Sequence, residues 1–138
     1  MAQWFALGET LGFAAQPGCV AGAFRLIDTQ MGSALPVVQS VPRAVQMVQD
    51  RGAVALDRAG LPPDQALVDI VNMSRSLGIK MRRAGLEGRA CMDDVVESAF
   101  RYALDNPAAV LGFDSDLGAL MLMDPDTSVL IVAIGGET

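Results

Sequence analysis

Two apolar runs near the end of the chain constrain its fold more than any other feature. They cover residues 117–123 and 128–134, and the segment Asp-Pro-Asp-Thr at residues 124–127 joins them. The second run is rich in β-branched residues, which favour strands, whereas Asp and Pro favour turns. The pattern therefore predicts a β-hairpin with a four-residue turn.

Neither strand of this hairpin alternates between apolar and polar residues. Every residue from Ala119 to Met123 is apolar, and so is every residue from Val129 to Ile134. Runs of this kind are typical of strands that are covered on both faces. We expect helices of the same chain to cover one face. The other face needs a partner, which is either further strand from the N-terminal region or another subunit.

Two segments in the first half of the chain have helical signals. After Pro17, apolar residues recur at helical intervals, which predicts a helix over residues 17–31. The segment before it is ambiguous between a short strand and a helical turn. Further on, Ser40 and Pro42 are typical of a helix start, and Gly52 is typical of a helix end.

The second half holds the two clearest helical patterns. In residues 63–84, apolar side chains recur at i, i+3, i+4 and i+7, so we expect one long helix with a weak point at Gly78. Glycines in the stretch 85–88 separate it from a second apolar stripe over residues 92–103. That stripe ends near Pro107, because proline disfavours the helical conformation of the residue before it.

These elements predict the fold class. A length of 138 residues suits one domain, and a hydrophobic content of 51% excludes a disordered chain. We expect a single α+β domain over residues 1–138, with three to four helices packed on a small antiparallel sheet that includes the C-terminal hairpin. No apolar run reaches the roughly 18 residues of a membrane span, and no signal peptide is evident. We therefore expect a cytoplasmic protein.

Histidine is absent, which excludes much of enzyme chemistry. Without an imidazole the chain cannot form a Ser-His-Asp or a Cys-His nucleophile pair, and two cysteines are too few for a structural zinc site. We expect Cys19 and Cys91 to be two reduced, partly buried thiols. A disulfide between them is the alternative, and it would require an oxidising compartment. We expect no cofactor and no metal.

Charge is distributed unevenly along the chain. Residues 75–89 carry five basic residues and one acidic residue, whereas residues 90–138 carry nine acidic residues and one basic residue. A basic window can bind phosphate or RNA, but this one contains no aromatic residue for base stacking, and the whole chain has a net charge of −6. We therefore expect no nucleic-acid binding. The window, which includes Arg82 and Arg83, is expected to pair with the acidic part of the same domain or of a second copy.

Four carboxylates flank the first strand of the predicted hairpin. Asp114 and Asp116 precede the strand, and Asp124 and Asp126 follow it. Carboxylate oxygens suit Mg²⁺ or Ca²⁺, yet the strand between the pairs separates them by roughly 23–30 Å. The two pairs therefore cannot share one ion within a subunit, and we expect them to form turns.

Three functions remain open on these grounds. The first is a non-enzymatic protein-interaction module, either an acidic oligomeric adaptor or a chaperone-like factor, that forms a homo-oligomer through the C-terminal hairpin. The apolar content and the eight methionines support it. The second is a small-molecule or acyl-ligand-binding protein with an apolar pocket beneath the hairpin, and the third is a small enzyme that uses Asp and Arg without histidine. The candidate binding residues are Arg82, Arg83, Asp114, Asp116, Met121 and Met123.

Overall fold

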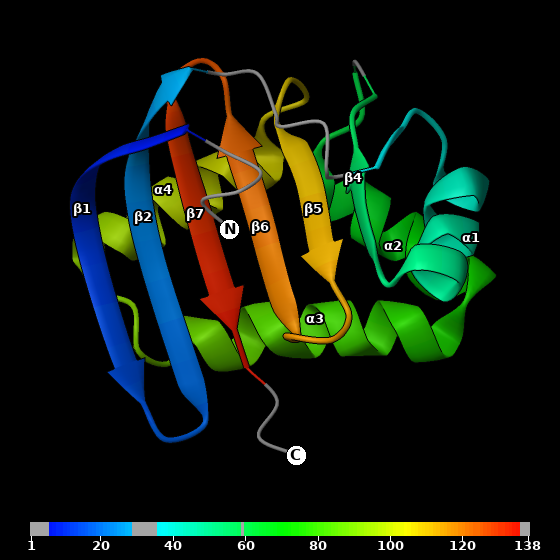
Figure 1. Ribbon diagram of the computed structural model, residues 1–138, viewed down its shortest axis with the longest axis horizontal. Helices are drawn as coiled ribbons and strands as arrows, with labels where there is room; N and C mark the ends of the chain where they lie inside the picture. Colours follow the sequence, from blue (N-terminus) through cyan, green and yellow to red (C-terminus); the bar gives the residue numbers. More distant parts are fainter. Residues whose placement is uncertain (1–5, 29–35, 59, 136–138) are drawn as a thin grey trace.

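The computed structural model describes residues 6–28, 36–58 and 60–135. Its centre is a seven-stranded sheet with the strand order β1-β2-β7-β6-β5-β4-β3 (Figure 1). Neighbouring strands are antiparallel, except that β3 runs parallel to β4. The strands are β1 (Ala6–Gln16), β2 (Cys19–Asp28), β3 (Val37–Val38), β4 (Ala53–Leu56), β5 (Val110–Asp114), β6 (Ala119–Asp124) and β7 (Val129–Ile134). The helices are α1 (Val41–Arg51), α2 (Pro63–Met73), α3 (Arg75–Arg89) and α4 (Asp94–Asp105).

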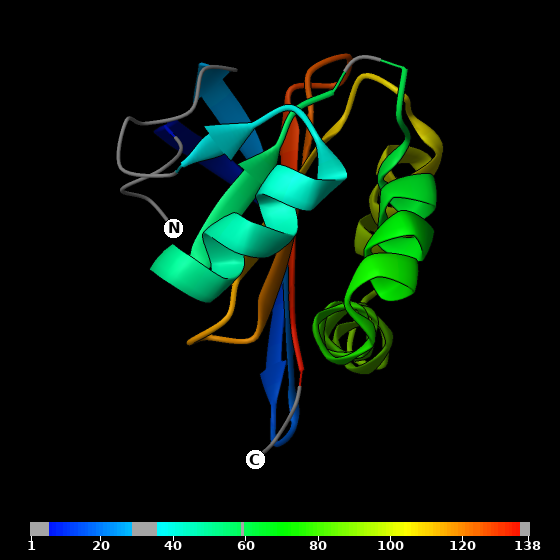
Figure 2. The same cartoon turned by 90° about the vertical axis from the view of Figure 1, so that its right-hand side faces the viewer.

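Three of the helices cover one face of the sheet. Figure 2 shows the sheet from its edge, with α2, α3 and α4 on the same side. Helix α3 runs across β2, β7 and β6 (Figure 1), whereas α1 packs against β4 and α2 at the β3–β4 end of the sheet. The expected α+β arrangement of helices packed on a sheet is confirmed. The sheet is larger than expected, and one of its strand pairs is parallel.

The C-terminal hairpin forms as predicted, and it lies in the middle of the sheet. Strands β6 and β7 pair with each other, while β5 and β2 flank them. Leu120, Leu122 and Ile131 pack beneath the helices, whereas Met121 and Val132 lie on the other face. All five side chains are buried, so both faces of the hairpin are covered. The N-terminal strands β1 and β2 extend the sheet beside β7.

The helix predicted over residues 17–31 is wrong, because most of this segment is strand β2. Pro17 and Gly18 form the two-residue turn of the β1–β2 hairpin, in which Gln16 pairs with Cys19. The proline therefore belongs to a hairpin turn and not to a helix start. Residues 29–31 lie outside the described part of the chain. The ambiguous segment before Pro17 is strand β1, so the helical turn considered there is wrong as well.

The long helix predicted over residues 63–84 is also wrong, because it is two helices. Helix α2 ends at Met73, Ser74 has an extended conformation with φ −138° and ψ 98°, and α3 begins at Arg75. Gly78 is not the weak point. It is buried where α3 meets α2, and a Cβ atom there would collide with Val71. The chain changes direction at Ser74, and the two helices pack on each other at a steep angle (Figure 2).

The glycine-rich stretch 85–88 does not separate two helices. Gly85 and Gly88 lie inside α3 and face the sheet. A Cβ atom on Gly88 would approach Ala133 Cβ to 2.6 Å and Ala133 Cα to 2.9 Å. Glycine at this position therefore lets the backbone of α3 come close to strand β7, which is a tertiary requirement that helix propensity does not reveal.

Helices α1 and α4 follow their local signals. Ser40 Oγ accepts the N–H of Arg43 at 3.4 Å, and Gly52 closes α1 in a left-handed conformation. Helix α4 ends at Asp105, just before Pro107. Among the residues with described coordinates, no helix combines the length and the apolar character needed to cross a bilayer.

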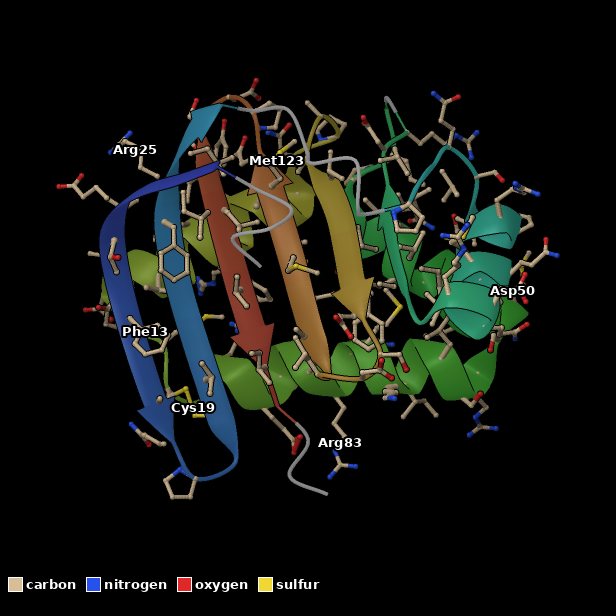
Figure 3. All side chains as sticks on the ribbon, in the orientation of Figure 1. Phe13, Cys19, Arg25, Asp50, Arg83 and Met123 are labelled. Carbon is tan, nitrogen blue, oxygen red and sulfur yellow. A yellow bond between two sulfur atoms is a disulfide. The ribbon has the colours of Figure 1, made fainter. Side chains whose placement is uncertain are left out.

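The expected pair of reduced thiols is replaced by a disulfide between Cys19 and Cys91. The two Cα atoms are 6.3 Å apart, although the residues are 72 positions apart in the chain. Cys19 begins strand β2, at the lower end of the β1–β2 hairpin (Figure 3), and Cys91 follows the end of α3. The bond thus ties the hairpin to the α3–α4 connection. The 72-residue separation of the two cysteines does not indicate that they are close. Their proximity depends on the fold, which brings the start of β2 near the end of α3.

Candidate functional site

A cavity of about 170 Å³ lies between the three helices that cover the sheet. Its apolar lining consists of Leu67 from α2, Leu86 from α3, Phe100 and Leu104 from α4, and Leu120 from β6. The other lining residues are Asp64, Arg82, Gly85 and Arg89. The cavity therefore combines an apolar surface with two guanidinium groups and one carboxylate.

Helix α3 places both arginines at the cavity. Arg82 and Arg89 are seven residues apart, so they leave the same face of the helix about 10 Å apart along its axis. Gly85 lies between them, and a Cβ atom there would come within 3.2 Å of Leu120 Cδ2 and 3.5 Å of Phe100 Cζ. The missing side chain at Gly85 thus lets α3 pack closely against Leu120 and Phe100 at the cavity.

Arg89 is positioned by an aromatic ring and a carboxylate. Its guanidinium carbon lies 5.9 Å from the centroid of the Phe100 ring, which is within the range of a cation–π contact. Its Nη2 atom is 3.8 Å from Glu97 Oε2, in a pair that is partly open to solvent and therefore weak. Within the described ranges, Arg82 has no carboxylate oxygen within 4.0 Å. The Arg82 guanidinium is therefore available to an anion.

The six candidate residues from the sequence do not form one site. Arg82 lines the cavity, but Arg83 lies on another side of α3, where its Nε atom is 3.1 Å from Glu87 Oε1. Figure 3 shows Arg83 pointing away from the sheet below α3, and Met123 on the sheet face opposite the helices. Met121 and Met123 are buried there, at 1% and 5% exposure.

Asp114 is the last residue of β5, and Asp116 lies in the turn between β5 and β6. Asp114 Oδ1 accepts the N–H of Asp116 at 2.9 Å and the N–H of Leu117 at 3.2 Å, which is how a turn-forming aspartate acts. Next to them, Lys80 Nζ donates a hydrogen bond to Ser115 Oγ at 2.8 Å. Across the described ranges, no cluster of three or more potential metal ligands occurs.

In the described ranges, the basic window of residues 75–89 and the acidic part of the chain form one ion pair. Arg89 of α3 reaches Glu97 of α4, whereas Arg83 pairs with Glu87 inside the window itself. The expectation of pairing within the domain is therefore met by Arg89 in the described residues. It does not extend to Arg82.

Sequence reasoning missed three residues that shape the cavity: Gly85, Arg89 and Phe100. Gly85 and Arg89 lie beyond the predicted end of the helix at residue 84, so that prediction does not place them on the face of Arg82. The seven-residue spacing of the two arginines is the signal that a longer helix would have shown. Phe100 was expected in the core, and its contact with Arg89 depends on the packing of α4 against α3.

A comparison of the chain with protein-family models, curated proteins and solved structures found no match. Any conclusion about the ligand of the cavity therefore depends on the geometry and charge of its lining residues.

Proposed function

We propose that this protein is a non-enzymatic binding protein for a small amphipathic anion, with the cavity between α2, α3 and α4 as its site. The observation that carries the proposal is that Arg82 and Arg89 line one cavity together with an apolar surface from α2, α4 and β6. Guanidinium groups recognise carboxylates through paired N–H donors. Leu67, Phe100 and the neighbouring leucines would take the apolar body of the ligand.

The volume of the cavity limits the size of the ligand. At about 170 Å³ the cavity is smaller than the roughly 300–1,000 Å³ of typical pockets for drug-sized ligands. A carboxylate with a short acyl chain fits this limit, whereas a long fatty acid does not. The proposed ligand therefore agrees with the second hypothesis from the sequence, an acyl-ligand-binding protein, and is narrowed to a short-chain carboxylate.

The lining favours binding over catalysis. Asp64 is the ionisable lining residue besides the two arginines, and the lining set contains no hydroxyl, thiol or amine nucleophile. Covalent catalysis needs a nucleophile together with a group that activates it. The cavity offers charge recognition and apolar contact instead.

Calorimetric titration with hexanoate tests this proposal, with 1-hexanol as the neutral probe of similar length. We expect hexanoate to bind and 1-hexanol to bind much more weakly. Arg82→Gln and Arg89→Gln should each weaken hexanoate binding about tenfold or more, since a hydrogen bond to a charged group contributes about 1.5–3 kcal/mol. Arg83→Gln is the matched control, because it removes the same charge from another side of α3. Equal losses in Arg82→Gln and Arg83→Gln, or no binding of hexanoate, would contradict the proposal.

A protein-interaction module is the second candidate, and the outer row of α3 favours it. Arg75, Ile79, Arg82 and Leu86 follow one another at spacings of four, three and four residues, which places them on one side of the helix. Ile79 is 50% exposed and Leu86 is 66% exposed. A mixed basic and apolar row suits an acidic amphipathic helix of a partner. Ile79→Glu should abolish such an interaction while leaving hexanoate binding intact, because Ile79 does not line the cavity.

The expected homo-oligomer through the C-terminal hairpin remains a prediction. Met121, Leu130 and Val132 are at most 6% exposed in a single chain, so the hairpin offers little surface to a second copy. Sedimentation analysis at micromolar concentration tests this expectation.

Two further expectations also remain predictions. A cytoplasmic chain would hold Cys19 and Cys91 as thiols, since disulfides persist mainly in oxidising compartments. Counting free thiols after rapid alkylation in denaturant tests the location, because both cysteines are buried in the native fold. Absence of nucleic-acid binding is tested by gel shift, in which a salt-sensitive complex lost in an Arg82→Ala, Arg83→Ala double variant would contradict it.

A further inference from the structure

Asp124, the last residue of β6, has a buried carboxylate whose two oxygens differ in their surroundings. The side chain is 1% exposed. Its Oδ1 atom accepts the Nδ2–H of Asn106 at 2.9 Å and the backbone N–H of Asp126 at 2.9 Å. Its Oδ2 atom is buried and has no hydrogen-bond partner among the described residues. A buried polar atom without a partner is costly and therefore requires an explanation.

The turn itself does not require this burial. The preceding turn, between β5 and β6, has the same arrangement, in which Asp114 Oδ1 accepts the N–H of the residue two positions on. Asp114 is only partly buried, so its other oxygen can reach water. In the β6–β7 turn, Asp124 Oδ1 performs the same role. The buried position of Asp124 Oδ2 is therefore an additional feature of this turn.

Asp124 lines a hollow of about 540 Å³ between α4 and the β6–β7 turn. Val95, Ala99 and Val129 supply apolar surface, and the partly exposed Tyr102 adds an aromatic ring. Asp94 is the second carboxylate in the lining. No basic side chain belongs to the lining as far as the structure describes the chain, so the hollow carries negative charge without a counter-charge.

The chemistry of the hollow fits an organic cation better than a metal ion. A divalent cation needs several oxygen ligands, whereas Asp124 offers one free oxygen, because its other oxygen already accepts two hydrogen bonds. A primary ammonium group donates hydrogen bonds in three directions and can be satisfied by one carboxylate and nearby hydroxyl groups. Ser98 and Thr127 bring such hydroxyl groups to the lining.

We propose that the hollow between α4 and the β6–β7 turn is a binding site for a small primary alkylammonium ion. The ammonium group donates to Asp124 Oδ2 when the side chains that bury this oxygen move aside, and the alkyl chain lies against Val95, Ala99 and Val129. Tyr102 adds a cation–π contact at the edge of the site. The site is separate from the anion cavity, because Ser98 and Tyr102 leave α4 on the side opposite Phe100. Neither proposal depends on the other.

Titration with butylamine near neutral pH, followed by amide NMR shifts, tests this inference, with 1-butanol as the neutral probe. We expect butylamine to saturate and to shift signals of Ser98, Tyr102 and Thr127, and 1-butanol to have no such effect. Asp124→Asn should weaken butylamine binding at least tenfold, because the amide places a donor or a weaker acceptor where the carboxylate oxygen was. Asp114→Asn is the matched control, since Asp114 has the same place in the preceding turn but does not line the hollow.

A second variant keeps the proposal testable if Asp124→Asn fails to fold. Ser98→Leu fills the hollow from an exposed helix position while Asp124 stays unchanged, and it should also weaken butylamine binding about tenfold. Absence of saturation, equal effects of butylamine and 1-butanol, or equal losses in Asp124→Asn and Asp114→Asn would overturn the proposal. Competition by millimolar Mg²⁺ or Ca²⁺ that depends on Asp124 would also overturn it, because the site would then be a metal site.

Discussion

Gly118 and Ser128 occupy equivalent positions in two successive hairpin turns, and both have positive φ values, 64° and 56°. Each residue stands four positions after an aspartate whose Oδ1 atom accepts the N–H two residues on, at 2.9 Å. Glycine adopts this left-handed conformation without steric cost, whereas serine does not. The two turns on either side of β6 thus have the same arrangement. The left-handed position is strained only in the second turn, where Ser128 occupies it.

This equivalence predicts opposite effects of two reciprocal substitutions. Ser128→Gly should raise the free energy of unfolding by about 0.5–1 kcal/mol. It relieves the left-handed strain, and this gain is larger than the loss that comes from the greater entropy of the unfolded chain. Gly118→Ser should lower it by about 1 kcal/mol for the same reason. Urea denaturation measures both changes. A shift of both variants in the same direction would contradict the equivalence of the turns.

The disulfide between Cys19 and Cys91 predicts a large redox effect on stability. The bond joins residues 72 positions apart, and closing a loop of that length in the unfolded chain stabilises the fold by about 4 kcal/mol in the chain-entropy model. Reduction should therefore lower the urea midpoint of the protein. A Cys19→Ser, Cys91→Ser double variant should unfold at the lower midpoint with or without reductant. If the unmodified protein unfolds identically under both conditions, the two cysteines are not bonded in solution.

The burial of Met121 predicts that it stabilises the single chain. Because the side chain is 1% exposed, Met121→Ala should lower the free energy of unfolding by about 2–5 kcal/mol. Leu117→Ala is the control, since Leu117 is 54% exposed in the turn before β6 and should change stability by about 0.5 kcal/mol or less. Sedimentation of both variants separates this role from a role in assembly. A wild-type dimer that Met121→Ala converts into a stable monomer would identify this face as a contact between copies.

The close packing of Gly88 against β7 predicts that Gly88→Ala lowers the free energy of unfolding, although such a substitution inside a helix usually raises it. Replacing an interior helical glycine by alanine usually stabilises by about 1 kcal/mol. In Gly88→Ala the new methyl group would meet Ala133 of β7, so we expect a loss of about 1–3 kcal/mol instead. Ser76→Ala, at an exposed position of the same helix, should be neutral or slightly stabilising. Thermal unfolding of the two variants checks the difference, and a stabilised Gly88→Ala variant would show that α3 packs less closely on the sheet.

The sequence predicts well those elements whose signals are local. The hairpin of β6 and β7 follows from two apolar runs and a turn, and α1 follows from Ser40 and Gly52 at its ends. A cap, a turn or a proline acts on the residues next to it, so its effect can be derived without knowing the rest of the fold. The α+β class follows from the presence of both kinds of element.

The errors occur where distant residues decide the structure. The apolar spacing after Pro17 suits a helix, but pairing of β2 with β1 and β7 makes the segment a strand. The break at Ser74 and the glycines of α3 depend on how closely α3 packs on α2 and the sheet. None of these contacts has a local signal, because the energy that decides them comes from partners far away in the chain.

By itself, the sequence determined the C-terminal hairpin, the limits of α1 and α4, the absence of histidine chemistry and the separation of charge along the chain. Only the tertiary structure decided that Arg82 and Arg89 face one cavity, that Cys19 meets Cys91 and that Asp124 Oδ2 is buried without a hydrogen-bond partner in the described part of the chain. Burial and proximity are properties of the packed fold, since they depend on the elements that surround a side chain and not on its neighbours in sequence. The candidate sites of this protein arise from that packing.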